Sequence, residues 1–302
     1  MSTLPRLTRR SFLATAGGGL AAAVVDSAVS RPGPPVDEPR VRFGVRTPFR
    51  EKTVRERALL LQRLGYEGLE LGPEFLSGTA DSILKELEGT GIVVSAIVGS
   101  IKLLDIDPKA RAEAVELDRR RLRMARELGA SGVIEVPVFG PNRFQDLSPL
   151  MTPREIEDRL LIAGLKQLAP DVERTGVSLL IEPLTKKETH YMNLQSHGAQ
   201  IIQAVGAPGF KLLSDFYHMQ MEEKDIAATL ADCGKYTGYV HLADGAKRTE
   251  PGSLPFDYRP GFRALKNAGF SGWLTVECGA TDNPEAALAR ALKYIKQQWS
   301  EA

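Results

Sequence analysis

Four residues of types that bind metal ions follow apolar runs in the second half of this 302-residue sequence. They are Glu182, Asp215, His241 and Glu277, and they lie 33, 26 and 36 residues apart. A charge at the end of an apolar run is costly to bury unless it is paired or bound to a metal. Any one of them alone could be a salt-bridge partner. Three carboxylates and one imidazole together suit one divalent ion, such as Mn²⁺, Co²⁺, Mg²⁺ or Zn²⁺.

A divalent ion beside carboxylates can support proton transfer next to a carbonyl group. Removal of such a proton leaves an enediolate, and a metal that binds the carbonyl and adjacent hydroxyl oxygens stabilises its negative charge. One carboxylate acts as the base, and its conjugate acid returns the proton. Two glutamates on different strands could address opposite faces of one carbon, which epimerisation requires. Return of the proton to the neighbouring carbon gives aldose–ketose isomerisation, and the sequence leaves both outcomes open.

The segments that carry these residues belong to a regular alternation that starts at about Val41. Short apolar runs, typical of buried strands, alternate with longer amphipathic segments, typical of helices. The predicted strands are 41–48, 66–71, 92–98, 132–138, 177–183, 210–216, 238–244 and 272–278. The predicted helices lie near 53–64, 80–88, 109–128, 153–175, 196–205, 224–233, 259–267 and 284–298.

Eight strand–helix units within residues 41–302 predict an α/β fold, a single (β/α)8 TIM barrel. The alternative is an open doubly wound sheet. That alternative is disfavoured because no GxGxxG motif follows the first strand and no P-loop motif occurs. In a TIM barrel the active site lies at the carboxyl ends of the strands. One ligand from each of the last four strands would therefore converge on one point at the barrel mouth.

The motifs around these residues carry a family resemblance. They are Ile181-Glu182-Pro183-Leu184 with Glu188 and Asn193, Asp215-Phe216-Tyr217-His218, Val240-His241-Leu242-Ala243-Asp244, and Val276-Glu277. They resemble the xylose-isomerase-like TIM barrels, in particular the sugar phosphate isomerase/epimerase branch with its ketose 3-epimerases and hydroxypyruvate isomerases. The resemblance covers about residues 41–299 and is specific in the second half of the chain and only general in the first.

The resemblance implies a metal-dependent isomerase or epimerase of a small sugar or hydroxy-carbonyl compound. One divalent ion would be held by Glu182, Asp215, His241 and Glu277, and the two glutamates would also exchange the substrate proton. The expected partner is a small-molecule sugar, and because relatives are often dimers or tetramers, a homo-oligomer is expected as well.

The resemblance also implies which residues contact the substrate. Glu188 and His218 match substrate-contacting positions of the family. Relatives often place a cation after the seventh strand, and we assign this position to Lys247, with Arg248 as the alternative. Arg46 and Glu70 near the ends of the first two strands could support the site or form a plain salt bridge.

Composition excludes several other functions. The chain has 39 basic and 38 acidic residues, a net charge of +1, which provides no electrostatic footprint for nucleic acid. Two cysteines cannot form a disulfide scaffold or a zinc site of three or four thiolates. Metal-dependent DNA-repair endonucleases share the architecture, but their three-metal clusters use many histidines, and this chain has four. We therefore expect no nucleic-acid partner.

Two further alternatives remain within carbohydrate chemistry. A metal and a carboxylate beside a carbonyl can also drive β-elimination, so the chain could be a lyase or dehydratase that acts on a keto-sugar or a 3-keto-glycoside. A non-enzymatic sugar-binding protein is the other alternative. It is disfavoured because a binding module has no need of all three carboxylates.

The N-terminal segment predicts export. Residues 1–30 contain Thr8-Arg9-Arg10-Ser11-Phe12-Leu13, which resembles a bacterial twin-arginine signal. An apolar stretch and a small-residue cleavage site before Arg31 follow. Residues 31–40 form a proline-rich linker. The apolar run is too short to span a bilayer, so we expect a periplasmic or other extracytoplasmic domain that has no membrane segment.

Overall fold

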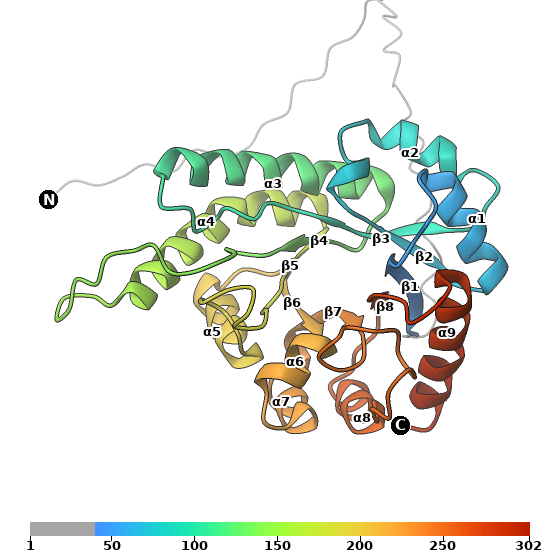
Figure 1. Cartoon of the computed structure of the whole chain (residues 1–302). Helices are drawn as coiled ribbons and strands as arrows, with labels where there is room; N and C mark the ends of the chain where they lie inside the picture. The colour runs from blue at the N-terminus through green and yellow to red at the C-terminus, as the bar shows by residue number, and fades with distance from the viewer. Residues whose placement is uncertain (1–39) are drawn as a thin grey trace, which may run out of the picture. The chain divides into compact units, whose positions relative to one another are not determined.

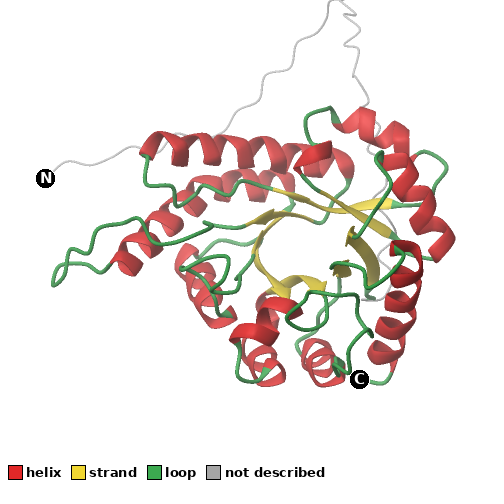
Figure 2. Ribbon diagram, viewed as in Figure 1, coloured by secondary structure: helices red, strands yellow, loops and turns green. Residues whose placement is uncertain are grey.

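A computed structural model describes residues 40–302, and the segments predicted to be an export signal and a linker lie outside this range, apart from residue 40. The described residues form a closed barrel of parallel strands in the order β1 to β8, and the predicted TIM barrel is thus confirmed (Figures 1 and 2). The strands are β1 Arg42–Thr47, β2 Gly68–Leu71, β3 Val93–Val98, β4 Gly132–Glu135, β5 Ser178–Ile181, β6 Phe210–Asp215, β7 Thr237–Leu242 and β8 Trp273–Glu277.

Helices surround the barrel and connect successive strands (Figure 2). They are α1 Val54–Leu64, α2 Ala80–Leu87, α3 Pro108–Leu128, α4 Pro153–Thr175, α5 Gln195–Val205, α6 Phe216–Glu222, α7 Ile226–Cys233, α8 Arg259–Asn267 and α9 Pro284–Ser300. Two short 3-10 helices, η1 Pro73–Phe75 and η2 Gly234–Tyr236, lie between them. Within the described residues, no helix has the length and apolar character needed to cross a membrane.

Local sequence determines where the long helices begin and end. The side chains of Thr53 and Thr152 each accept a hydrogen bond from the backbone amide of the third helical residue. That residue is a glutamate in both helices, and its side chain accepts a hydrogen bond from the backbone amide of the capping threonine. Such reciprocal capping satisfies amide groups that the first helical turn leaves unpaired. At the other end, α3 stops at Gly129, which has a left-handed φ of 70° that glycine adopts without a Cβ clash.

The barrel interior supports the mouth with a small polar network among apolar side chains. Tyr239 is fully buried, and its hydroxyl contacts Ser95 Oγ at 2.8 Å and accepts a hydrogen bond from Thr275 Oγ1 at 2.7 Å. Its ring packs edge-on against His241, with the ring centroids 5.6 Å apart. The network therefore helps to position His241, near the carboxyl end of β7, from the barrel interior.

Candidate metal centre

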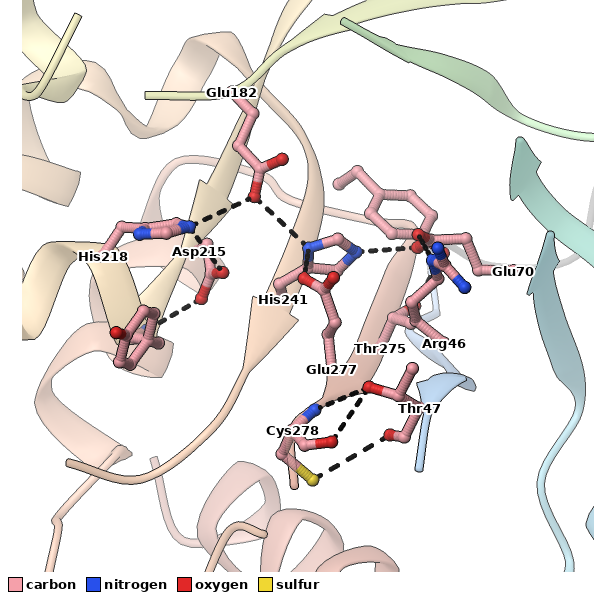
Figure 3. Close-up of polar contacts among 12 residues, drawn as sticks. Arg46, Thr47, Glu70, Glu182, Asp215, His218, His241, Thr275, Glu277 and Cys278 are labelled. Carbon is pink, nitrogen blue, oxygen red and sulfur yellow. Dashed lines mark hydrogen bonds and ion pairs between the residues drawn. The ribbon is translucent and has the colours of Figure 1, made fainter. Parts of the chain in front are cut away.

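The four predicted metal ligands lie together at the carboxyl ends of the last four strands. Glu182 follows β5 directly, Asp215 ends β6, His241 lies in β7 and Glu277 ends β8. One potential ligand atom from each residue falls within 4.8 Å of those of the other three. Figure 3 shows these side chains pointing toward one another. Barrel closure thus brings into one cluster residues that are nearly a hundred positions apart in the sequence.

His241 has one ring nitrogen outside the cluster and one inside it. Its Nε2 lies 2.7 Å from Glu70 Oε2, and Glu70 in turn lies 3.4 Å from the Arg46 guanidinium. Its Nδ1 lies 2.9 Å from Glu277 Oε2 and 3.5 Å from Glu182 Oε1. In a neutral ring whose Nε2–H donates a hydrogen bond to Glu70, the Nδ1 lone pair is available to a metal.

The residues present fit a divalent cation. Two atoms of the cluster, Glu182 Oε1 and His241 Nδ1, are buried and have no hydrogen-bond partner among the described residues. Burial raises the pKa of Glu182 and of Asp215, because removing a carboxylate from water disfavours its charged form. A bound cation would satisfy the unpaired atoms and offset this cost. Three carboxylate oxygens and one imidazole nitrogen are a donor set that such ions accept.

Arg248 also reaches this cluster. Its Nη2 donates to Asp215 Oδ2 at 2.8 Å and to Glu277 Oε2 at 2.5 Å, and its guanidinium lies 4.6 Å from the Tyr217 ring centroid. Arg248 is the non-glycine residue with a positive φ, 51°, among the described residues, a conformation that costs energy and is found at functional sites. Lys247 is exposed and does not line the cavity. The structure therefore brings the alternative cation, not Lys247, into the site.

His218 lies on α6 beside the cluster and is almost fully buried. Its Nδ1 accepts a hydrogen bond from the Thr185 backbone amide at 3.1 Å, so the proton of a neutral ring is on Nε2. That Nε2 has no hydrogen-bond partner among the described residues and lies 3.5 Å from Asp215 Oδ2. Burial lowers the pKa of His218, which favours this neutral form. His218 is thus placed to donate to an incoming oxygen.

Glu188 lies in the loop after β5, with Oε1 3.9 Å from His218 Nδ1, and its side chain is one-third exposed. Glu188, His218 and Arg248 all line one cavity of about 620 Å³ that opens over the metal ligands. Glu182, His241 and Glu277 line its floor. Of the three predicted substrate-contacting residues, two therefore face the same space as the cluster.

Arg46 and Glu70 support the cluster and do not form only a plain salt bridge. Both line the cavity, and Glu70 contacts His241 of the cluster directly. Sequence reasoning left these two roles open because a salt bridge and a supporting contact have the same sequence signal. Cys278, next to Glu277, is buried, and its Sγ lies 3.9 Å from the Thr47 backbone oxygen.

One buried group near the cavity has no counterpart in the sequence predictions. Ser100, which lines the cavity, donates its amide to Asp118 Oδ1 at 2.7 Å and its hydroxyl to Asp118 Oδ2 at 3.0 Å. The same hydroxyl lies 3.1 Å from Glu135 Oε1. Burial raises the pKa of Asp118 to about 6 and that of Glu135 well above its usual value. Burial therefore makes both carboxyl groups harder to ionise than they are in water.

Comparisons with known proteins agree with this architecture. A family model described as "Xylose isomerase-like TIM barrel" matches residues 59–298. The 3-dehydro-D-guloside 4-epimerase of Escherichia coli K12 is 26% identical over 253 residues, which cover 82% of this chain and 96% of the relative. The probable ketose 3-epimerase of Synechocystis is 23% identical over 262 residues, with 83% and 89% covered.

Solved structures show the same fold. An E. coli 3-keto-D-glucoside 4-epimerase superposes with a TM-score of 0.74 at 23% identity, covering 85% of this chain and 100% of the other. A D-psicose 3-epimerase structure determined in the presence of D-fructose gives a TM-score of 0.74 at 18% identity, covering 86% and 99%.

Proposed function

The chain belongs to the family of xylose isomerase-like TIM barrels, and we propose that it is a metal-dependent isomerase or epimerase that moves a proton beside the carbonyl group of a sugar. The relatives are sugar epimerases and isomerases, which supports an enzyme of this class. The observation that carries the proposal is the cluster of Glu182, Asp215, His241 and Glu277, of which Glu182, His241 and Glu277 line the cavity.

The four residues of the cluster would hold the divalent ion. When bound, that ion supplies the positive charge that stabilises an enediolate. The side chains of the protein carry out the proton transfer itself. Glu182 and Glu277 exchange the proton, one as base and the other as acid, and they come from β5 and β8, strands separated by β6 and β7. Carboxylates on separated strands approach a substrate carbon from different sides, which suits epimerisation.

Substrate orientation falls to the residues above the cluster. His218 Nε2 donates a hydrogen bond to a substrate oxygen, and Arg248 binds another with its guanidinium. Glu188 accepts from a hydroxyl group near the cavity mouth. Hydrogen bonds with charged groups stabilise a complex by about 1.5–3 kcal/mol each, enough to hold one face of the sugar toward each glutamate.

Elemental analysis together with deuterium exchange tests the proposal. Purified protein should contain about one divalent ion per chain, and D₂O should introduce deuterium beside the carbonyl of a ketose or keto-sugar. Label on the original carbon indicates epimerisation, and label on the neighbouring carbon indicates isomerisation. Release of water or of an alcohol would instead identify elimination.

Variants assign the roles within this experiment. Glu182→Gln should abolish deuterium exchange while circular dichroism stays that of the wild type. Asp215→Asn and His241→Ala should each lower the metal content. Unchanged stoichiometry in both variants, after reconstitution with Mn²⁺, Co²⁺ or Zn²⁺, would show that the four residues are structural and would end the proposal.

A further inference from the structure

Glu188 lies on a loop whose position affects how well this residue can bind substrate. The loop, residues 182–194, joins β5 to α5. The Glu188 side chain lines the cavity and is one-third exposed, and its backbone amide donates to the Thr185 oxygen of the same loop at 2.9 Å. Ordering a mobile group on binding costs free energy, so a loop that is held in place beforehand gives tighter binding.

A second loop holds the backbone of Glu188. This loop is the connection between β4 and α4 at residues 136–152. The Gly140 amide donates to the Glu188 oxygen at 2.7 Å, and the His190 amide donates to the Gly140 oxygen at 3.1 Å. These two bonds form a parallel bridge between Gly140 and Thr189. The amide and the carbonyl oxygen of Gly140 are thus both bonded to the loop that carries Glu188.

The His190 side chain reinforces this contact. Its Nδ1 lies 2.8 Å from the Gly140 oxygen, and its Nε2 lies 2.6 Å from Glu157 Oε1. A carbonyl oxygen can only accept a hydrogen bond, so Nδ1 carries a proton and donates it to Gly140. Glu157 belongs to α4 and is buried, whereas the His190 side chain is 20% exposed. The ring therefore connects Gly140 to a long helix of the barrel.

The contact at Gly140 has no substitute between these two loops. The connection between β4 and α4 is long and extends away from the barrel (Figure 1). Within the part of the chain that the structure describes, every hydrogen bond between it and residues 182–194 involves Gly140. The side chains of Asn142 and Asp146 bond only within their own loop. Long surface loops are mobile unless they are tied down, so Gly140 is the point at which this loop can fix the Glu188 backbone.

We propose that His190 is a positioning residue for Glu188. The inference rests on the proposed function, in which Glu188 accepts a hydrogen bond from a hydroxyl group of the substrate. Glu157 anchors the His190 ring to α4, the ring holds the Gly140 oxygen, and the Gly140 amide holds the Glu188 oxygen. The Glu188 carboxylate is thereby presented to the cavity in one place. His190 does not line the cavity, so it acts on the substrate through Glu188.

His197 provides a matched control. Its Nε2 lies 2.7 Å from Oδ1 of Asp158, the neighbour of Glu157 on α4, so it also contacts this helix through a carboxylate. His197 is 4% exposed, and among the described residues no hydrogen bond joins it to a residue that lines the cavity. Loss of the His197 ring should therefore disturb the packing against α4 and leave Glu188 in place.

Hydrogen exchange followed by mass spectrometry measures whether the two loops stay together. In His190→Ala the backbone amides around Gly140 should exchange about 3- to 10-fold faster, the effect of one lost hydrogen bond on local opening. His197→Ala should leave their exchange unchanged. His190→Asn should restore slow exchange, because its side-chain amide can take the place of Nδ1, whereas His190→Gln extends toward Glu157 and should not. Unchanged exchange in His190→Ala would overturn the inference.

Calorimetry of the metal-loaded protein with D-fructose as the ketose probe measures the effect on binding. His190→Ala should weaken binding by about 3- to 10-fold. In a Glu188→Ala background the same substitution should change the affinity by less than about twofold, because its effect passes through the Glu188 side chain. The loss should appear in KM, with kcat within about twofold of the wild type, because Glu182 and Glu277 are unchanged.

Binding and turnover separate this inference from the proposed function. If the affinities follow the expected pattern but no deuterium enters D-fructose, the positioning role stands and the proposed reaction fails for this ketose. If deuterium enters D-fructose and His190→Ala binds it like the wild type, the reaction stands and the inference is overturned. Equal losses of affinity on His190→Ala with and without Glu188, or in His190→Ala and His197→Ala, would show a merely structural role and would also overturn it.

Discussion

At the residue scale, Arg248 and its neighbour Lys247 form a natural pair for mutagenesis. Arg248 contacts Asp215, Glu277 and the Tyr217 ring, while Lys247 points to solvent. Arg248→Met should lower kcat/KM by about 10- to 150-fold, the worth of one charged hydrogen bond to substrate, with about one metal per chain retained. Lys247→Met should stay within about twofold of the wild type. Initial rates of deuterium exchange measure both, and equal losses would contradict the assignment of Arg248.

Glu70 supplies a second prediction at this scale, because it holds His241 through Nε2. Glu70→Gln should weaken metal binding by about 10- to 100-fold, the usual effect of losing a carboxylate behind a ligand histidine. Glu74→Gln is the matched control. Glu74 contacts Arg46 and Arg57, but its side chain is 44% exposed, and it is not among the four ligands or their contacts. Competition with a fluorescent chelator gives both affinities, and equal values would rule out the role of Glu70.

That Glu182, Asp215, His241 and Glu277 lie together could be predicted from the sequence, because the ends of the strands can be recognised in it. Each ligand follows an apolar run, and parallel strands of a barrel end at one mouth. The choice between Lys247 and Arg248 could not be predicted, because it depends on the turn. Gly245 and Arg248 both have positive φ, and Asp244 pairs with Thr249 across this turn. The burial of Asp118 could not be predicted either, since its helix also carries many solvated charged residues.

At the element scale, the predicted strands agree with the observed ones except at their ends. The fourth strand was predicted to reach residue 138 but stops at Glu135. Pro137 follows shortly after and has no amide to donate to a neighbouring strand. The sequence reasoning also missed α6, which begins immediately after β6 with Asp215 as its N-cap. His218 is consequently buried on a helix and is not an exposed loop residue.

Ser100, Asp118 and Glu135 connect the end of β3 with α3 and β4, and this contact predicts a pH dependence of the free energy of unfolding. The folded pKa of Asp118, about 6, lies above its unfolded value near 3.9. Stability from the protonated carboxyl is therefore present in full below about pH 4 and is lost as pH rises through about 6. In Asp118→Asn the part of this loss that Asp118 causes should be absent. The wild type should lose about 2 to 3 kcal/mol of unfolding free energy relative to the variant between pH 4 and 7.

Urea unfolding of the two metal-free proteins at a series of pH values measures this difference. Metal-free protein is required because protons compete with a bound metal for its ligands, and loss of metal in acid would add a second pH dependence. Glu135→Gln should reduce the same dependence, since burial raises the pKa of Glu135 as well. Parallel pH profiles for the wild type and Asp118→Asn would show that Asp118 is ionised in the folded protein throughout this range.

At the scale of the whole molecule, the closed barrel brings the four candidate metal ligands together. β1 joins β8 through strand pairing, and Thr47 Oγ1 both donates to the Cys278 oxygen at 2.9 Å and accepts from its amide at 3.1 Å. Glu277 lies at the carboxyl end of the strand that closes the barrel, next to Cys278. An unfolded chain separates the four ligands by dozens of residues, so a metal loaded at this site requires a folded barrel.

The need for a folded barrel before metal binding bears on the twin-arginine signal predicted in residues 1–30. The twin-arginine route carries proteins that fold before export, and a metal site assembled from four strands can be filled before transport. We therefore propose that the chain is exported by this route.

Arg9→Lys combined with Arg10→Lys should abolish the extracytoplasmic pool in a bacterial host, because the paired arginines are the recognised feature of the signal. Arg6→Lys, in the same segment but outside the pair, should be exported like the wild type. Immunoblots of fractionated cells, with a cytoplasmic marker for leakage, measure all three. If the double variant still appears outside the cytoplasm in wild-type amount, the paired arginines are not the export signal.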